Sequence, residues 1–195
     1  LDCSGPVARL FIDRPDKRNA FDQAMWTLLP ELVEAAVADP AVRVLTLESA
    51  HPGMFCAGAD IAELLANRTD PAWLAANHAA IERAQYVLAR AAKPVIAFID
   101  GDCVGGGCGL ALAADIRVAT PRARLGITPA KLGLVYPLHD TKLLIDLVGP
   151  GQAKRMLFTG MLLDAAEALR IGLVDELADS PGHLEDLVSG NSPHS

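Results

Sequence analysis

Apolar residues along the chain fall into two alternating patterns: short continuous runs, and longer segments with helical spacing. The short runs are β-branched or apolar and bounded by turn formers, which is typical of buried strands. They occupy residues 7–12, 42–47, 95–99 and 116–119. Helical spacing covers about 22–37 and 71–92, and a glycine-opened helix follows the third run. Strands alternating with helices predict an α/β fold with largely parallel, covered sheets.

Two of these helices carry start signals. Asp22 and Asp70 stand where an N-cap carboxylate accepts from first-turn N–H groups, and Pro71 takes the first helical position after Asp70. From about residue 129 onward the pattern changes and predicts helices only, over 138–148, 152–158 and 164–170. The sequence therefore predicts a strand-and-helix core followed by a helical region.

Composition sets the class of protein. The chain has 195 residues, 51% of them apolar and 21% charged, enough for one sizeable core and a single domain. Apolar stretches are interrupted before they could span a bilayer, and the first residues lack the layout of a signal peptide, so we expect no membrane partner and a cytoplasmic location. A net charge of −7 without a Lys/Arg stripe argues against nucleic acid. The four cysteines and five histidines show no metal-ligand spacing, so we expect no metal.

Glycines mark the first candidate site. Gly105, Gly106, Gly107 and Gly109 follow the strand at 95–99 and open a helix-like run. Free N–H groups and the positive dipole end of that helix would face any docked group, which predicts an anion or oxyanion receptor. The glycines do not keep the G-x-G-x-x-G spacing of a dinucleotide fingerprint, and no P-loop motif is present, which disfavours both nucleotide interpretations.

A second small-residue loop, residues 55–61, follows the strand at 42–47 just as the glycine run follows 95–99. Two such loops at the ends of neighbouring strands can each direct one backbone N–H at a shared point. That geometry is an oxyanion hole.

Six motifs then occur in a familiar order: RPDKRNAF, FCAGADI, KPVIA, GGGC, AADIR and GLVD, at residues 14–21, 55–61, 93–97, 105–108, 113–117 and 172–175. In this order they resemble the crotonase (enoyl-CoA hydratase/isomerase) superfamily over almost the whole chain. The resemblance implies a crotonase-like ββα spiral core that binds acyl-CoA thioesters and stabilises their enolates. It also implies no cofactor beyond the coenzyme A of the substrate, and assembly as a homotrimer or a dimer of trimers.

The resemblance further implies a division of the chain. Residues 1–180 would form the spiral acyl-CoA-binding domain, and 181–195 the start of a C-terminal helical segment whose remainder is not present. Residues 189–195 have the composition of a turn leading into another helix, so we expect the C-terminal helical region to be truncated.

Carried over residue by residue, the resemblance assigns the two oxyanion donors to the N–H groups of Ala59 and Gly106. It places the coenzyme A adenine against backbone and the nucleotide phosphates near basic side chains; the residues are Ala57, Asp60, Ile61, Lys17 and Arg18. Because Asp60 follows a Gly-Ala turn and precedes an apolar helical run, its side chain is predicted first as a helix cap.

Two departures from the family pattern concern the acid and base. Hydratases that resemble this chain use two glutamates because hydration needs both, and the matching positions here are Gly109 and Pro129. The position at which dienoyl isomerases of the family place an aspartate is Pro137. The loop at 128–136 instead resembles that of methylmalonyl-CoA decarboxylases, and Tyr136 falls on their pocket tyrosine.

A decarboxylase has the smallest need for acid and base. Loss of carbon dioxide leaves its electrons in the thioester, so the enzyme must stabilise an enolate oxyanion and desolvate the carboxylate. The first hypothesis is therefore decarboxylation of a malonyl-type CoA, with catalytic Ala59, Gly106 and Tyr136.

Two alternatives stay open. The chain could hydrate or isomerise an enoyl-CoA with a base from His139, Asp140, Glu63 or further C-terminal helices. It could also be a catalytically silent acyl-CoA-binding protein that keeps only the binding fold.

Overall fold

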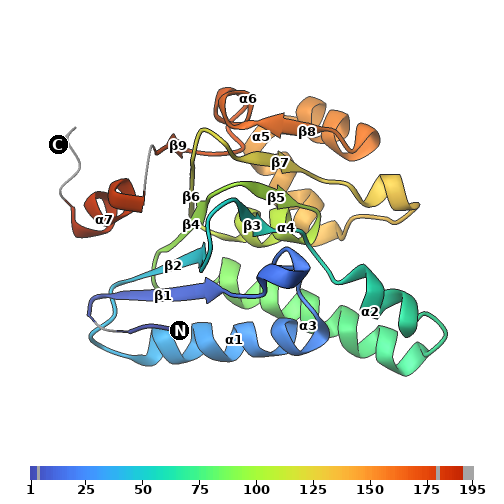
Figure 1. Cartoon of the computed structure of the whole chain (residues 1–195), viewed down its shortest axis with the longest axis horizontal. Helices are drawn as coiled ribbons and strands as arrows, with labels where there is room; N and C mark the ends of the chain where they lie inside the picture. The colour runs from blue at the N-terminus through green and yellow to red at the C-terminus, as the bar shows by residue number, and fades with distance from the viewer. Residues whose placement is uncertain (4, 179–180, 191–195) are drawn as a thin grey trace.

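The computed structural model describes residues 1–3, 5–178 and 181–190 (Figure 1). The first part of the chain contains β1 (Val7–Ile12), η1 (Pro15–Lys17), α1 (Gln23–Ala38), β2 (Val44–Ser49), β3 (Met54–Cys56), α2 (Ile61–Ala66), α3 (Pro71–Ala89), β4 (Val95–Ile99) and β5 (Asp102–Val104). It is followed by α4 (Gly106–Ala113), β6 (Ile116–Ala119), β7 (Arg124–Gly126), η2 (Pro129–Leu132), α5 (Leu138–Thr159), β8 (Leu162–Asp164), α6 (Ala165–Arg170), β9 (Glu176–Leu177) and α7 (Pro181–Ser189).

The strands form two sheets. The larger has five strands in the order β1-β2-β4-β6-β9, all parallel. The smaller has the order β3-β5-β7-β8, in which only β8 runs antiparallel to its neighbour. The pairs β2–β3, β4–β5 and β6–β7 each send one strand to each sheet before the chain enters a helix. Repetition of this ββα unit produces the spiral that the family resemblance implied (Figure 1).

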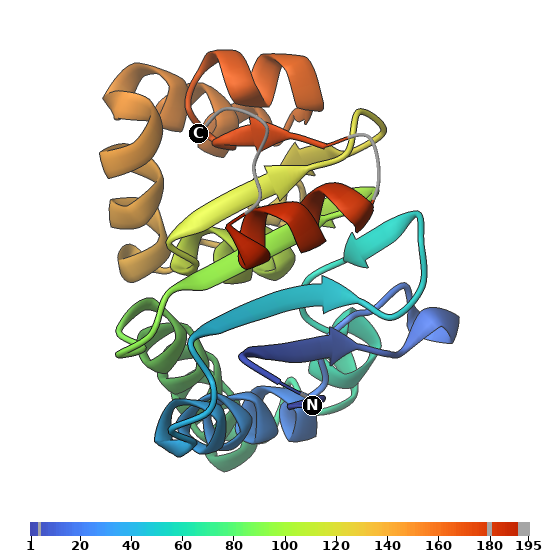
Figure 2. The ribbon, with the colours of Figure 1, turned by 90° about the vertical axis from the view of Figure 1, so that its left-hand side faces the viewer.

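Strand β4 is buried along its whole length because both faces of the larger sheet are covered. Ile96 and Phe98 pack with Leu184 of α7, which lies across one face of the sheet in Figure 2. Ala97 and Ile99 alternate with them and point into the main core on the other face. This two-sided burial explains why the sequence of β4 is continuously apolar rather than alternating.

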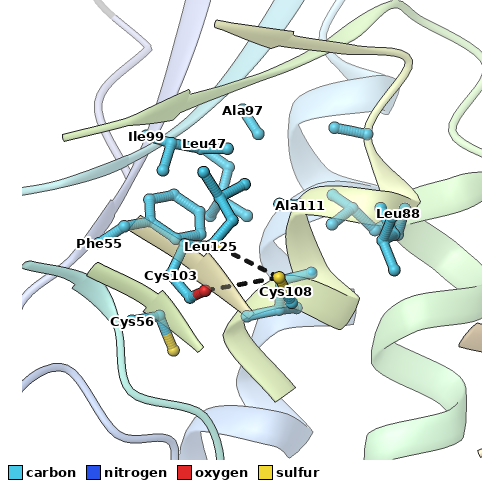
Figure 3. Close-up of a cluster of buried hydrophobic side chains, with 14 of the residues drawn as sticks. Leu47, Phe55, Cys56, Leu88, Ala97, Ile99, Cys103, Cys108, Ala111 and Leu125 are labelled. Carbon is cyan, nitrogen blue, oxygen red and sulfur yellow. Dashed lines mark hydrogen bonds between the residues drawn. The ribbon is translucent and has the colours of Figure 1, made fainter. Parts of the chain in front are cut away.

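The main core lies between the sheets and the helices. Figure 3 shows Phe55 and Leu125 of the smaller sheet beside Leu47 of the larger one. Cys103 and Cys108 meet in this core with their sulfur atoms 4.0 Å apart, and the Cys108 thiol also approaches the carbonyl of Cys103 at 3.4 Å. Both side chains are buried, so Cys108 fills space beneath the glycine loop.

The predicted helix starts are confirmed. Asp22 accepts from the N–H of Met25, and Asp70 accepts from the first turn of α3, which begins with Pro71. The two helices predicted over 138–148 and 152–158 appear as two halves of α5. Gly149 separates them with a left-handed φ of 74°, and Pro150 begins the second half.

The prediction of helices only after residue 129 was wrong. β8 pairs with the edge of the smaller sheet and β9 with the edge of the larger one. These strands are three and two residues long, as short as the equally unpredicted β3, β5 and β7, and such lengths are too short for a periodic pattern. Helix α7 occurs where the C-terminal helical segment was expected, but the turn expected at 189–195 lies mostly outside the described residues. Among the described helices, none combines the length and apolarity that crossing a bilayer requires.

Candidate active site

A cavity of about 390 Å³ opens beside the junction of β3 and α2. Its walls come from α3, the N-terminus of α4, the segment at 134–137 and the first turn of α5. The lining is mainly apolar, with Trp73, Leu74 and Ile81 of α3 on one side. Ala59, Gly106 and Tyr136, the three predicted catalytic residues, all line this cavity.

Backbone pairing with Phe21 orients the N–H of Ala59. The N–H of Phe21 donates to the carbonyl of Gly58, and the N–H of Asp60 donates to the carbonyl of Phe21, each at 2.8 Å. Successive N–H groups of an extended segment point in opposite directions, so the N–H of Ala59 faces away from Phe21. Gly58 has φ of +97°, and a Cβ there would lie 2.9 Å from the nitrogen of Gly106. Only glycine therefore allows the two loops to approach this closely.

Gly106 is the first residue of α4, so its N–H has no partner within the helix. The preceding Gly105 turns the chain with φ of 56° and ψ of −119°, a conformation that glycine alone adopts readily. A Cβ on Gly106 would lie 3.4 Å from the nitrogen of Ala59. Within the part of the chain that the structure describes, neither N–H donates to a protein acceptor. Two free donors thus converge at the cavity, beside the positive end of a helix dipole.

Asp140, in the first turn of α5, is the buried carboxylate of the cavity, with only 1% of its surface exposed. The Nε2 of Gln85 on α3 donates to its Oδ2 at 2.8 Å, and the Tyr136 hydroxyl lies near enough to favour the ionised carboxyl. Its Oδ1 has no hydrogen-bond partner among the described residues. Burial raises the pKa of Asp140 to about 6, although Gln85, the charge of His139 and Tyr136 oppose the shift.

Tyr136 is also buried, and its hydroxyl lies 3.4 Å from the carbonyl of Gly105. Burial, followed by the charge of Asp140, raises the pKa of Tyr136 well above its usual range. Tyr136 therefore stays a neutral phenol that can donate one hydrogen bond in the cavity.

The family model for enoyl-CoA hydratase/isomerase matches residues 2–187. The chain belongs to the enoyl-CoA hydratase/isomerase family. A crotonyl-CoA hydratase of Syntrophomonas wolfei is 38% identical over 91% of this chain and 67% of its own length. An (E)-benzylidenesuccinyl-CoA hydratase of Thauera aromatica is 33% identical over 96% of this chain and 72% of its own length.

Solved structures of the family share the fold. One from Hyphomonas neptunium has a TM-score of 0.91 and 42% identity, covering 97% of this chain and 72% of that one. An enoyl-CoA hydratase from Bacillus anthracis has a TM-score of 0.89 and 28% identity, covering 97% of this chain and 73% of that one. The described α/β spiral is therefore the crotonase fold of the enoyl-CoA hydratase/isomerase family, and it covers about three quarters of those two chains.

The two positions that the family resemblance assigns to hydratase glutamates have different surroundings. A Cβ on Gly109 would lie 2.4 Å from Nε2 of Gln85 and 2.7 Å from Oδ2 of Asp140. Side chains from α3 and α5 thus already fill the space beside Gly109. Pro129 begins η2 and lines the cavity, and Pro137 precedes the first residue of α5. None of these three positions carries an ionisable group.

The other candidate bases are placed differently from Asp140. Glu63 lines the cavity, but its Oε2 accepts from the N–H of Gln23 at the start of α1, 2.9 Å away. His139 lines a neighbouring cavity beside Pro137 and Leu138. Asp140 is thus the candidate base that combines burial, a place in the main cavity and an unpartnered oxygen.

The residues assigned to coenzyme A lie on or beside the loop at 55–61. Asp60 caps α2 as predicted, accepting from Ala62, Glu63 and the Arg14 guanidinium. Burial raises the pKa of Asp60, but these hydrogen bonds outweigh it and hold the pKa below its usual range.

Lys17 and Arg18 are exposed at the end of η1. The carbonyl of Arg18 accepts from the N–H of Ala57 at 3.1 Å, which keeps this basic turn beside the loop. Ile61, 39% exposed, begins α2. Contact of any of these residues with coenzyme A stays a prediction.

Gln85 is the site residue that sequence reasoning missed. It lies on α3 between Ile81 and Leu88, within a stripe of Ile81, Ala84 and Leu88 that faces the interior. A polar side chain inside an apolar stripe needs a buried partner, and this signal was available in the sequence. The partner could not be named, because it lies 55 residues away on another helix.

Proposed function

We propose that this enzyme of the enoyl-CoA hydratase/isomerase family binds an acyl-CoA thioester with its carbonyl oxygen between the N–H groups of Ala59 and Gly106. The observation that carries the proposal is the convergence of these two unpartnered donors at the cavity. Negative charge develops on the carbonyl oxygen as an enolate forms, and preorganised donors in a partly dry site stabilise that charge more than the neutral ground state.

The first reaction we propose is decarboxylation of a malonyl-type CoA. Neither Gly109 nor Pro129 can transfer a proton, and the cavity contains no Lys or Arg among its described lining residues. An apolar wall would desolvate the substrate carboxylate, and the neutral Tyr136 hydroxyl would orient it for alignment with the carbonyl π system. Desolvation of the carboxylate and its alignment with the carbonyl π system both favour loss of carbon dioxide.

A second candidate is isomerisation or hydration of an enoyl-CoA. The carboxyl group of Asp140 in the cavity favours it, because moving a double bond needs one group that removes and returns a proton. Several relatives are hydratases by name, which also supports this candidate.

The experiment that separates these candidates is a substrate panel. We would incubate the protein with malonyl-, methylmalonyl-, crotonyl- and 3-enoyl-CoA and follow each acyl group by mass spectrometry, with NMR for isomers of equal mass. Loss of carbon dioxide would support the decarboxylase, and gain of water or a moved double bond would overturn it in favour of the second candidate. Binding of all four thioesters without turnover would indicate a catalytically silent acyl-CoA-binding protein.

The remaining proposals concern the contacts with coenzyme A, the assembly of the protein and its location. We propose that Lys17 and Arg18 lie near the coenzyme A phosphates and that backbone at Ala57, Asp60 and Ile61 contacts the adenine. We also propose a homotrimer or a dimer of trimers in the cytoplasm. Sedimentation analysis tests the assembly, and weaker thioester binding by a Lys17→Ala, Arg18→Ala double variant tests the phosphate contact.

A further inference from the structure

We propose that the carboxyl group of Asp140 is a catalytic residue that transfers the proton at the carbon next to the thioester carbonyl. It would do so from α5, in place of a glutamate on α4 or η2. This inference rests on the proposed binding of an acyl-CoA thioester at Ala59 and Gly106.

The unpartnered oxygen of Asp140 points to a ligand. Oδ2 is held by Gln85, whereas Oδ1 has no partner among the described residues although the side chain is almost completely buried. A buried carboxylate oxygen without a partner is costly and rare in folded proteins. Because Asp140 also lines the cavity, its carboxyl group is placed where it can exchange a proton with a bound molecule.

The position of Asp140 relative to the oxyanion donors suits this role. Gly109 lies three residues after Gly106 on α4, which is about 4.5 Å along the helix axis. Oδ2 of Asp140 lies only 2.7 Å from where a Cβ on Gly109 would stand. The reacting carbon is bonded to the carbonyl carbon, so a thioester oxygen at the N–H of Gly106 keeps that carbon within a few ångströms of the start of α4. Asp140 therefore occupies the place from which a glutamate at position 109 would act.

Gln85 fixes the carboxyl group in that place. Its amide donates to Oδ2 at 2.8 Å and leaves Oδ1 without a partner among the described residues. This placement of Gln85 and Asp140 uses the space left by glycine at position 109, since a Cβ there would lie 2.4 Å from the Gln85 amide nitrogen and the side chains would have to shift. Glycine at 109 thus leaves the space that Gln85 and Asp140 fill together. In this arrangement Gln85 is a positioning residue, because it holds the carboxyl group of Asp140.

The proton balance closes for both candidate reactions. In decarboxylation, the bond to the carboxylate carbon breaks, its electron pair enters the thioester as an enolate, and protonated Asp140 gives its proton to the α-carbon. Water then reprotonates Asp140. In isomerisation, ionised Asp140 removes the α-proton, the electrons spread over a dienolate, and the same proton returns at the γ-carbon. In each case one proton passes between Asp140 and a substrate carbon.

Several ionisable groups surround Asp140 and bear on any pH profile. Tyr136 precedes it, His139 adjoins it on α5, and Cys103 and Cys108 lie beyond Tyr136 on β5 and α4. Other ionisable groups that line the two adjoining cavities are His78, Glu82, Asp60 and Glu63. The Asn variant at position 140 is needed to separate these groups from Asp140.

The test is exchange of the α-protons of butyryl-CoA in D₂O, followed by mass spectrometry and NMR. Butyryl-CoA has no carboxylate to lose and no double bond to move, so exchange reports proton transfer alone. We expect exchange in the wild type and at least a 100-fold loss in Asp140→Asn, because positioned acid–base catalysis contributes about 10²–10⁴-fold. The matched control is Asp146→Asn, an exposed aspartate on the same helix, which should exchange at the wild-type rate.

Binding of butyryl-CoA is measured calorimetrically on the same samples. Absence of binding by the wild type would overturn the proposed function together with this inference. Binding without α-proton exchange in the wild type, or equal exchange in Asp140→Asn, would overturn the inference alone. Added formate should restore part of the exchange in Asp140→Ala, which keeps the result independent of a structural effect of either substitution.

Gln85→Leu tests the positioning role. Gln85 lowers the pKa of Asp140, so its loss should move the half-maximum of the exchange profile to higher pH. A uniform loss of rate with an unchanged profile would assign Gln85 a packing role and contradict its positioning role.

Discussion

Ala59 and Gly106 contribute only backbone N–H groups to the cavity, whereas Gln85, Tyr136 and Asp140 contribute side chains. The backbone part depends on glycines that let two loops approach, and its donors exist whatever side chains follow. The side-chain part depends on three elements, α3, the segment before α5 and α5 itself. Under the proposed function, the backbone part would stabilise an oxyanion whatever the reaction, while the side-chain part would decide which reaction follows.

Breaking the backbone part should have the largest effect. Gly58→Ala places a Cβ 2.9 Å from both the nitrogen of Gly106 and the carbonyl of Val104, which separates the two donors. We expect kcat/KM to fall by about 10²–10³ on whichever thioester the panel identifies, the usual cost of losing one oxyanion donor.

Gly53→Ala is the matched control for this change. Gly53 has φ of +93°, close to the +97° of Gly58, but a Cβ there meets nothing within 4 Å. Both variants should lose stability through backbone strain, and only Gly58→Ala should lose activity. Equal activity in the two variants would mean that the approach of the loops is not needed.

In the side-chain part, burial of the Asp140 carboxyl group lowers the stability of the folded state when that group is ionised. The carboxyl of Asp140 holds its proton up to about pH 6 in the folded chain but only to about 3.8 when unfolded. The folded state therefore binds more protons between these values, and stability falls as pH rises through this window. We expect Asp140→Asn to be more stable than wild type above pH 6, by about 3 kcal/mol, and equally stable below pH 4. Denaturant unfolding at pH 8 and pH 3.5 measures this, and a variant destabilised at pH 8 would contradict it.

Tyr136 separates the two candidate reactions. Tyr136→Phe removes the phenol that would orient a substrate carboxylate, while the ring keeps its packing. We expect decarboxylation to fall about 10–100-fold, the cost of a hydrogen bond to a charged group, and isomerisation to change little. Steady-state assays with a malonyl-type and a 3-enoyl-CoA make the comparison. Full turnover of a malonyl-type CoA by this variant would contradict the decarboxylase hypothesis.

The smallest expected effect concerns the packing of the Gln85 side chain against Gly109 of α4. Gly109→Ala puts a methyl group 2.4 Å from the Gln85 amide, so we expect about 1–3 kcal/mol of destabilisation from overpacking. Gln85→Ala removes the nearest contact but also the donor to Asp140, so its cost should be smaller when it is added to Gly109→Ala than when it is made alone. Gly151→Ala in the second half of α5 is the control, because a Cβ there meets nothing within 4 Å. Thermal unfolding measures these variants and Gln85→Ala alone, and fully additive losses in the double variant would contradict the proposed clash.

The same contrast explains what the sequence could predict. The glycine run at 105–107 and the loop at 55–61 are each a contiguous stretch of sequence, so two local patterns were enough to predict donors that the structure brings to one cavity. The pairing of Gln85 with Asp140 joins residues 55 positions apart, which no local pattern reveals. The sequence points to Asp140 only because His139 and Asp140 are the ionisable pair nearest to the vacant glutamate position, and an aspartate at a helix start is favoured by the dipole whatever the chemistry. The strands of two or three residues were missed because their neighbours in the sheet, rather than their own sequence, determine them.

The crowding at Gly109 also constrains the order in which substitutions could convert this pocket into one with a glutamate on α4. A side chain introduced first at 109 would meet the Gln85 amide, and removal of Asp140 first would leave the cavity without its buried carboxylate. A first change at 85 would instead leave Asp140 without its hydrogen-bond donor, so each of the three possible first steps disturbs the pocket. An engineer who wants the glutamate arrangement should therefore change positions 85, 109 and 140 together, since none of the three is expected to be neutral alone.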